Sequence, residues 1–137
     1  MKLSNTSEYA IRILCFMAKD ENRLYSAKYL VDELKISDKY LRKLMTDLTK
    51  AGFIQSTKGR DGGYAFIKKP EEIYLADIIN VVEGMQKYLG CALGFNKCND
   101  KNPCVMHNTW VPVRNEFVRV FSTKTIKDLD IHLATKY

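Results

Sequence analysis

Residues 35–70 read KISDKYLRKLMTDLTKAGFIQSTKGRDGGYAFIKKP and contain the most informative pattern for the fold. It begins with apolar residues at positions 41, 44, 45 and 48, which is the i, i+3, i+4, i+7 spacing of a helix with one buried face. Ser37 can cap the start of this helix, and Gly52 suits its end. The pattern therefore predicts a helix that buries one face and leaves the other free.

A β-hairpin is predicted directly after this helix. Residues 53–58 and 64–68 have the aromatic and β-branched content of two short strands. Between them, GRDGG at 59–63 is a turn whose glycines can adopt positive φ. Pro70 closes the hairpin, because proline has no N–H to donate to a strand ladder.

Three further helices are predicted around this segment. Apolar residues at 10, 13, 14 and 17 mark a helix that begins near Ser4 or Asn5, and those at 75, 78, 79 and 82 mark one that ends at Gly84. Residues 27, 30, 31 and 34 mark a short helix with Ser26 as its N-cap. Only residues 35–37 separate it from the helix quoted above, so the pair is a helix-turn-helix candidate whose second helix would enter the major groove.

The positive charge of the chain is concentrated in the same segment. The 137 residues carry 22 basic and 16 acidic side chains, a net charge of +6. Residues 1–34 and 71–137 are each neutral, so residues 35–70 hold the whole excess. This distribution favours a polyanion as the partner of the helix and hairpin.

The predicted DNA-binding residues lie on the outer face of the second helix and on the hairpin. Arg42 and Lys43 are the candidates for base contacts, because they lie in the first turns of the helix and arginine suits guanine. Lys50, Lys58 and Arg60 are assigned to phosphate. The full set is Ser37, Lys39, Tyr40, Arg42, Lys43, Lys50, Lys58 and Arg60.

Two alternatives remain open for this surface. A tyrosine at position 40 packs as often as it contacts a base. The segment as a whole could also be a small helical core with a solvated basic helix, since helical spacing by itself is weakly specific. The helix pair, the basic outer face and the glycine-tipped hairpin with Arg60 occur together here, and this combination favours double-stranded DNA as the partner.

Composition indicates a cytoplasmic protein. The chain has no stretch approaching the roughly 18 apolar residues that span a bilayer, and residues 1–8, MKLSNTSE, lack the basic-then-apolar plan of a signal peptide. A cytoplasmic location disfavours structural disulfides among the four cysteines.

Three cysteines and a histidine form a second constellation, Cys91-x6-Cys98-x5-Cys104-x2-His107, in a segment rich in glycine and asparagine. Thiolates with imidazole suit zinc or an iron–sulfur cluster. Zinc knuckles usually contain Cys-x2-Cys pairs, which this loop lacks. Chance clustering in a loop, a zinc site and a thiol-based site remain the alternatives. Cys15 lies within the first predicted helix and is interpreted as a small buried hydrophobe.

The C-terminal part is predicted to be helical and to bury an apolar stripe. Residues 110, 113, 117, 120 and 121 recur at helical spacing, and the stripe is too wide for an exposed helix. Thr125 is expected to cap a short final helix over 126–134. The predicted fold is mainly α with a small β-hairpin. It comprises a winged helix-turn-helix domain over 1–84, a cysteine-bearing loop over 85–108, and a dimerisation helix with the C-terminal segment over 109–137.

The chain resembles the Rrf2 superfamily of winged-helix regulators over nearly its whole length. The resembling stretches are MKLS at 1–4, SDKYL at 37–41 followed by Leu44, GFI at 52–54, and the wing signature GRDGGY at 59–64. The cysteine loop, CVMH at 104–107 and Trp110 are similar to the cluster-binding stretch of the iron–sulfur regulator branch, IscR.

The resemblance implies a homodimer, joined mainly by the long helix after the cysteine loop, that binds a palindromic operator. It also implies that Cys91, Cys98, Cys104 and His107 hold a 2Fe–2S cluster. Some relatives take the fourth ligand from an acidic residue near the N-terminus of the other subunit. Glu8 stands at that place here, so a 4Fe–4S cluster like that of the NsrR branch is the alternative.

Three departures limit what transfers from the IscR branch. The first cysteine interval is one residue longer, and Arg42 stands where that branch has an acidic residue that helps choose the operator. Pro112 would be tolerated in a first helical turn or with a kink, so the long helix is expected to start near Thr109.

The sequence therefore predicts a DNA-binding transcriptional regulator that senses iron–sulfur, redox or nitric-oxide status. A thiol- or zinc-based regulator without iron is one alternative, and an iron–sulfur scaffold or electron-transfer protein is another. An enzyme is not expected, because the chain has neither a glycine-rich phosphate loop after a strand nor a recognisable pair of nucleophile and base.

Overall fold

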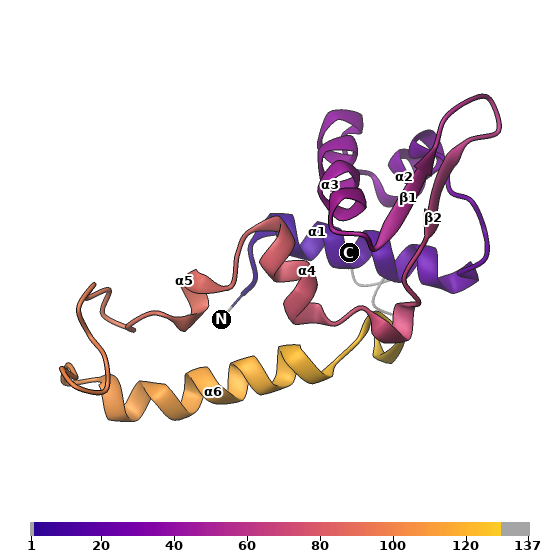
Figure 1. The fold of residues 1–137 in the computed structure, drawn as a ribbon. Coiled ribbons are helices and arrows are strands. Elements are labelled where there is room, and N and C mark those ends of the chain that lie inside the picture. Colours follow the sequence, from indigo (N-terminus) through magenta and orange to yellow (C-terminus); the bar gives the residue numbers. More distant parts are fainter. Residues whose placement is uncertain (1, 130–137) are drawn as a thin grey trace.

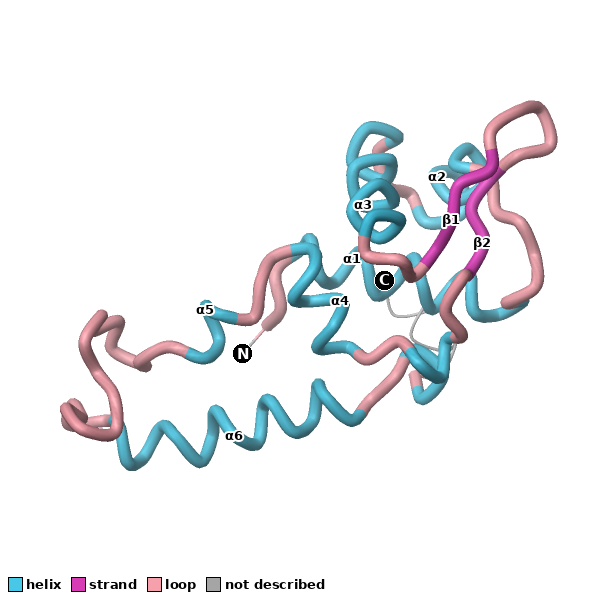
Figure 2. The backbone as a smooth tube through the Cα atoms, in the orientation of Figure 1, coloured by secondary structure: helices cyan, strands magenta, loops and turns pink. Residues whose placement is uncertain are grey.

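The fold is built around α1 (Asn5–Met17), on which the other N-terminal elements pack in the computed structural model, which describes residues 2–129 (Figure 1). Helices and one two-stranded hairpin account for its regular structure (Figure 2), which confirms the predicted fold class. The remaining α-helices are α2 (Ala27–Leu34), α3 (Asp38–Lys50), α4 (Leu75–Val82), α5 (Gln86–Leu89) and α6 (His107–Thr123). The 3₁₀ turns are η1 (Ala18–Asp20), η2 (Pro70–Glu72) and η3 (Ile126–Asp128).

Serine side chains start the first three helices at the predicted positions. The hydroxyl of Ser4 accepts from the Ser7 N–H, that of Ser26 from Tyr29, and that of Ser37 from Tyr40. Each bond satisfies an amide that the helix itself leaves without a partner. Lys35 ends α2 in the left-handed conformation, with φ of 56°. The chain can therefore reverse within residues 35–37 and begin α3.

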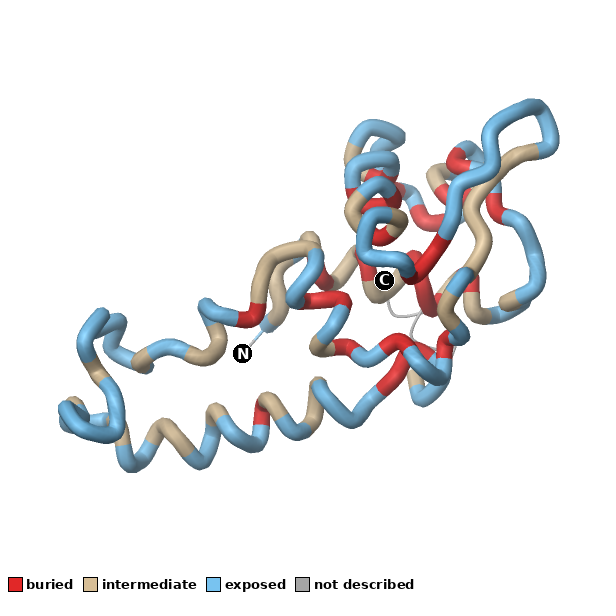
Figure 3. The backbone as a smooth tube through the Cα atoms, viewed as in Figure 1, coloured by how far each residue is buried: buried red, intermediate tan, exposed pale blue. Residues whose placement is uncertain are grey.

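The core lies where α1, α2, α3 and α4 meet. The apolar stripes predicted for these helices are buried almost throughout, and the fully buried side chains include Ile13, Leu30, Leu44 and Ile78. Figure 3 shows this concentration of buried residues around α1, α3 and α4, whereas α6 is mostly exposed or half-buried. The apolar faces of the helix pair are thus buried in the core, and the outer face of α3 is left in solvent.

The hairpin is shorter than predicted. β1 (Ile54–Thr57) pairs antiparallel with β2 (Gly63–Phe66), from Ile54 opposite Phe66 to Thr57 opposite Gly63. The N–H groups of residues 67 and 68 both turn to the carbonyl of Phe53, which ends the ladder. Tyr25 extends the hairpin by a bridge on the other edge of β2, with its N–H 2.9 Å from the carbonyl of Tyr64 and its carbonyl 2.7 Å from the Tyr64 N–H.

Substitution of Gly63 by alanine should loosen the hairpin. A Cβ at this position would lie 2.6 Å from the carbonyl oxygen of Tyr25, which belongs to the backbone and cannot move independently. We expect Gly63→Ala to lower the free energy of unfolding by about 1–3 kcal/mol, the usual cost of overpacking, in urea titrations. Gly90→Ala is the control, because its Cβ would approach nothing closer than the Gln86 carbonyl at 3.8 Å. Equal stability of the two variants would contradict the close approach.

The long C-terminal helix starts earlier than predicted. α6 begins at His107, not near Thr109, so Pro112 lies in its second turn. The helix tolerates this proline because the carbonyl that loses its donor, that of Asn108, belongs to an exposed residue. Thr125 caps η3 as expected, with reciprocal bonds between Thr125 and Asp128. The helix predicted over 126–134 is shorter than expected, because η3 ends at Asp128 and Leu129 is extended. Residues 130–134 lie outside the described residues. Within residues 2–129, no helix has the length and apolar character needed to cross a bilayer.

Candidate functional site

The outer face of α3 carries the basic residues predicted to contact DNA. Lys39, Arg42, Lys43 and Lys50 are exposed, whereas Leu41 and the rest of the apolar stripe are buried. Lys58 and Arg60 are exposed on the hairpin turn. Figure 1 shows α3 and this turn projecting from the same side of the molecule. The arrangement presents a helix for a major groove and a basic wing beside it.

Two of these side chains are paired within the helix. Arg42 donates from Nε to both carboxylate oxygens of Asp38 at 3.0 Å, and this hydrogen bond raises the pKa of the guanidinium. The Nζ of Lys43 lies 3.3 Å from Asp47. Exposed pairs of this kind contribute little to stability. Both cations can therefore exchange their carboxylate for a base edge or a phosphate.

Ser37 and Tyr40 have structural contacts. Ser37 caps α3. Tyr40 is half-buried; its hydroxyl donates to the Thr6 hydroxyl at 3.0 Å, and its ring meets Tyr9 edge-on with centroids 5.6 Å apart. Of the two roles left open for Tyr40, packing is the one the structure displays. A base contact by either residue stays a prediction.

Three cysteines of the predicted site come together in space. The sulfur atoms of Cys91, Cys98 and Cys104 all lie within 4.8 Å of one another. The Cys91 and Cys104 sulfurs are 3.5 Å apart, and the backbone N–H of Cys104 donates to the sulfur of Cys98 at 3.4 Å. The loop therefore folds so that residues 13 apart in sequence present sulfur to a common point.

His107 lies beside Cys98 in the first turn of α6, but it is not in the group of atoms that lie within 4.8 Å of one another, which comprises the three cysteine sulfurs. Its Nδ1 lies 3.5 Å from the Cys98 sulfur, and its Nε2 lies 2.9 Å from a carboxylate oxygen of Asp100. Asp100 stands in a turn that Asn99 stabilises by accepting the N–H groups of residues 101 and 102, each at 2.9 Å. A carboxylate that accepts from Nε2–H leaves the Nδ1 lone pair free to bind a metal.

The pKa values of three cysteines are shifted, downward for Cys91 and upward for Cys98 and Cys15. A hydrogen bond with the backbone of Phe95 is the main cause that lowers the pKa of Cys91 to about 7. For Cys98, a bond from the Cys104 backbone lowers the pKa, but burial and the neighbouring thiols outweigh it and raise the value. Burial raises the pKa of Cys15 to about 12, so this thiol stays protonated in the core.

Two side chains of α6 fasten the loop and were not predicted from the sequence. The indole N–H of Trp110 donates to the carbonyl of Gly90 at 2.9 Å, and Arg114 donates to that of Leu89 at 3.1 Å. The sequence places Trp110 in an apolar stripe and in the stretch that resembles the IscR branch, but neither observation predicts this hydrogen bond. A side chain that binds a backbone carbonyl has no sequence signal, because every residue supplies the same acceptor.

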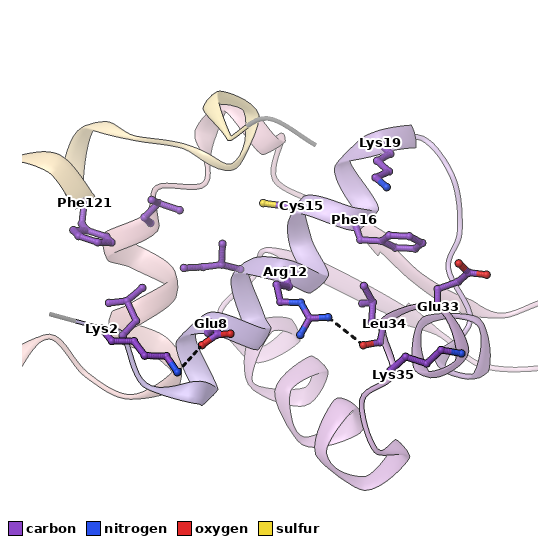
Figure 4. Close-up of a pocket in the computed structure, with 13 residues that line it drawn as sticks. Lys2, Glu8, Arg12, Cys15, Phe16, Lys19, Glu33, Leu34, Lys35 and Phe121 are labelled. Atoms are coloured by element: carbon purple, nitrogen blue, oxygen red, sulfur yellow. Dashed lines mark hydrogen bonds and ion pairs between the residues drawn. The ribbon is translucent and has the colours of Figure 1, made fainter. Parts of the chain in front are cut away.

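Glu8, the alternative fourth ligand, lies on a different surface of this chain. It lines a groove of about 840 Å³ along α1, where its carboxylate pairs with Lys2 at 3.7 Å (Figure 4). Ile11, Phe16 and Phe121 also line this groove. Because Glu8 would act from the other subunit, its place in one chain leaves that hypothesis untested.

Comparison with known proteins identifies the relatives of this chain. Residues 3–130 match the Rrf2 family, described as an iron-dependent transcriptional regulator. The transcriptional regulator NsrR of Geobacillus kaustophilus is 31% identical over 131 residues, covering 94% of this chain and 89% of that protein. Among solved structures, CymR, the global cysteine regulator of B. subtilis, superposes with a TM-score of 0.75 at 26% identity and covers 100% of this chain and 98% of its own.

The IscR of T. potens superposes with a TM-score of 0.70 at 26% identity and covers 93% of this chain and 85% of its own. Sequence and structure thus agree on the resemblance from end to end of the described region. The chain belongs to the Rrf2 family of DNA-binding transcriptional regulators.

Proposed function

We propose that this regulator adjusts its DNA binding through an iron–sulfur cluster held by Cys91, Cys98, Cys104 and His107. The observation that carries the proposal is the convergence of three sulfur atoms within 4.8 Å of one another. The donor set fits the group, because thiolates and imidazole are the protein ligands of 2Fe–2S and related clusters. The relatives named for NsrR and IscR, and the family description as iron-dependent, support the same chemistry.

In this proposal the cysteine loop and α6 act together. His107 is the first residue of α6 and Cys104 lies three residues before it, and Trp110 and Arg114 hold the carbonyls that precede Cys91. Ligation would fix both ends of the loop relative to this helix. A bound cluster would supply the signal by its sensitivity to oxygen, nitric oxide or iron shortage. The favoured form is 2Fe–2S with His107; 4Fe–4S with Glu8 of a second subunit is the alternative.

The experiment that tests the proposal is the iron and sulfide content, with a visible spectrum, of protein purified without oxygen. Iron and acid-labile sulfide in a fixed ratio would support it. Zinc in place of iron, or no metal at all, would overturn it and leave a DNA-binding regulator of another kind.

A thiol switch is the second candidate, and one distance favours it. The sulfurs of Cys91 and Cys104 are 3.5 Å apart, so a small movement would bring them to bonding distance. With a peroxide as oxidant, one thiolate would become a sulfenic acid with release of hydroxide, and the second thiol would then close the disulfide with release of water. The structural likeness to CymR supports this alternative. A metal-free protein that loses two thiols and gains a Cys91–Cys104 disulfide on peroxide treatment would establish it.

We also propose that the active species is a homodimer joined through α6. Val113 is 56% exposed, although it lies on nearly the same helix face as the buried Phe117. Part of the apolar stripe of α6 is therefore not covered by other residues described in this chain. An uncovered apolar stripe of this kind is typical of a surface that binds a partner. A two-fold dimer would place two α3 helices on the half-sites of a palindromic operator.

Val113→Asp should convert the dimer to a monomer. A carboxylate on the apolar stripe would have to be buried without a partner, which is costly. We expect sedimentation velocity to show half the mass of the wild type at micromolar concentration. Asn115→Asp is the matched control, because it adds the same charge to the same helix about 200° around its axis. A Val113→Asp protein that sediments like the control would refute this interface.

A further inference from the structure

Glu83 joins three elements at a point outside both sites described above. It follows α4 directly, and its side chain is only 7% exposed. It accepts hydrogen bonds from the hydroxyls of Ser4, Ser7 and Tyr88, and the Nζ of Lys87 lies 2.8 Å away. Burial works to raise the pKa of Glu83, but the bonds from Lys87, Ser7 and Tyr88 outweigh it, so the pKa is lowered. The carboxylate is thus ionised, and both of its oxygens have hydrogen-bond or ion-pair partners.

One side of this junction leads to the cysteine loop. Tyr88 belongs to α5, and its ring stacks on Phe117 of α6 with centroids 5.0 Å apart. The next two residues of the chain, Leu89 and Gly90, are those whose carbonyls are held by α6. Cys91 follows immediately. A movement of the loop relative to α6 must therefore pull on α5.

The other side leads to the recognition helix. Ser4 and Ser7 frame the first turn of α1, and Thr6 in the same turn accepts the hydroxyl of Tyr40 from α3 at 3.0 Å. Tyr9, one turn later, packs against the ring of Tyr40. The first turn of α1 consequently contacts Glu83 through its serines and α3 through Thr6 and Tyr9.

We infer that Glu83 is a positioning residue that links the cysteine loop to the recognition helix, through α5 on one side and the first turn of α1 on the other. A change in the loop would alter the donors that Tyr88 and Lys87 offer to Glu83. The first turn of α1 would shift in response and carry Tyr40 and α3 with it. The identity of the signal rests on the proposed function. The coupling between the loop and α3 rests only on the hydrogen bonds and ring contacts described above.

The first test compares operator affinity with and without the cluster. Glu83→Gln keeps the size of the side chain but removes its charge and adds donors, so the four donors can no longer all be satisfied. The ratio of the two operator Kd values in the wild type should lie in the usual coupling range of about 5–150-fold. We expect this ratio to fall toward one in Glu83→Gln. Glu116→Gln, which changes a glutamate in an exposed pair with Arg119, should keep the wild-type ratio.

The second test needs no cluster and so separates this inference from the proposed function. Trp110→Phe removes the donor to Gly90 but keeps an aromatic ring in α6. In cluster-free protein it should speed amide hydrogen exchange at residues 39–42, and it should add nothing in a Glu83→Gln background. Additive effects, or no effect of Trp110→Phe at all, would overturn the link. A lower Tm of Glu83→Gln with an unchanged affinity ratio in the first test would show a structural role only.

Discussion

A Cys98→Ser protein purified without oxygen is expected to lack iron, acid-labile sulfide and visible absorption, whereas the wild type has all three. Serine keeps the size of the side chain, and its hydroxyl can still accept the N–H of Cys104 that the Cys98 sulfur accepts at 3.4 Å. The loop should therefore keep its shape and lose only one of the three thiolates proposed to bind the cluster. Metal and sulfide analysis on the same preparation measures the effect.

Cys15→Ala is the matched control for this experiment. Cys15 is buried in α1 and its pKa is raised to about 12, so its removal should leave iron and sulfide at wild-type levels. A Cys98→Ser protein that retains both would show that the cluster is held elsewhere. Operator affinity tests separately whether the cysteine loop regulates DNA binding. If loaded wild type and Cys98→Ser bind every site equally, the loop does not regulate, and the DNA-binding function stands unchanged.

Local chemistry explains why most helices could be predicted from the sequence. Ser4, Ser26 and Ser37 start their helices through bonds to amides only three residues away. Because these contacts join residues close in sequence, they can be predicted from the sequence. The same holds for the apolar spacing that defines which face of each helix packs on the core. The four-residue α5 could not be found this way, because one turn is too short to show a period.

Contacts between distant residues were beyond the same reasoning. Glu83 accepts a hydrogen bond from the hydroxyl of Ser4, which lies 79 positions away in the sequence. No residue pattern near Glu83 predicts this contact. Asp100 beside His107 carries no sequence signal of its own, because exposed acidic residues in loops are usually solvated. The three cysteines could be grouped because they fall in one short loop, so their convergence needed no long-range information. The sequence was thus enough to group the three cysteines, but it did not reveal the residues that hold their loop in place.

Arg42→Ala should weaken binding to the operator by about 5–150-fold, the equivalent of 1–3 kcal/mol for one bidentate base contact. Arg42 lies in the first turns of α3, is exposed, and is held only by an exposed pair with Asp38. Such a pair opens at little cost, so the guanidinium is available to a guanine in the major groove. Affinity for random duplex should change much less, because a base contact carries sequence information and a phosphate contact does not. Titrations of both duplexes at one salt concentration measure this difference.

Arg60→Ala is the control that distinguishes a base contact by Arg42 from a phosphate contact. Arg60 stands exposed on the hairpin turn, where a phosphate is its expected partner. Its loss should weaken operator and random duplex alike and reduce the slope of log K against log salt by about 1. If Arg42→Ala behaves in the same way, Arg42 is a phosphate contact and α3 selects its sequence through other residues. If Arg42→Ala lowers only operator affinity, the first turns of α3 read the bases, and the sequence preference of this regulator depends on the residue at position 42.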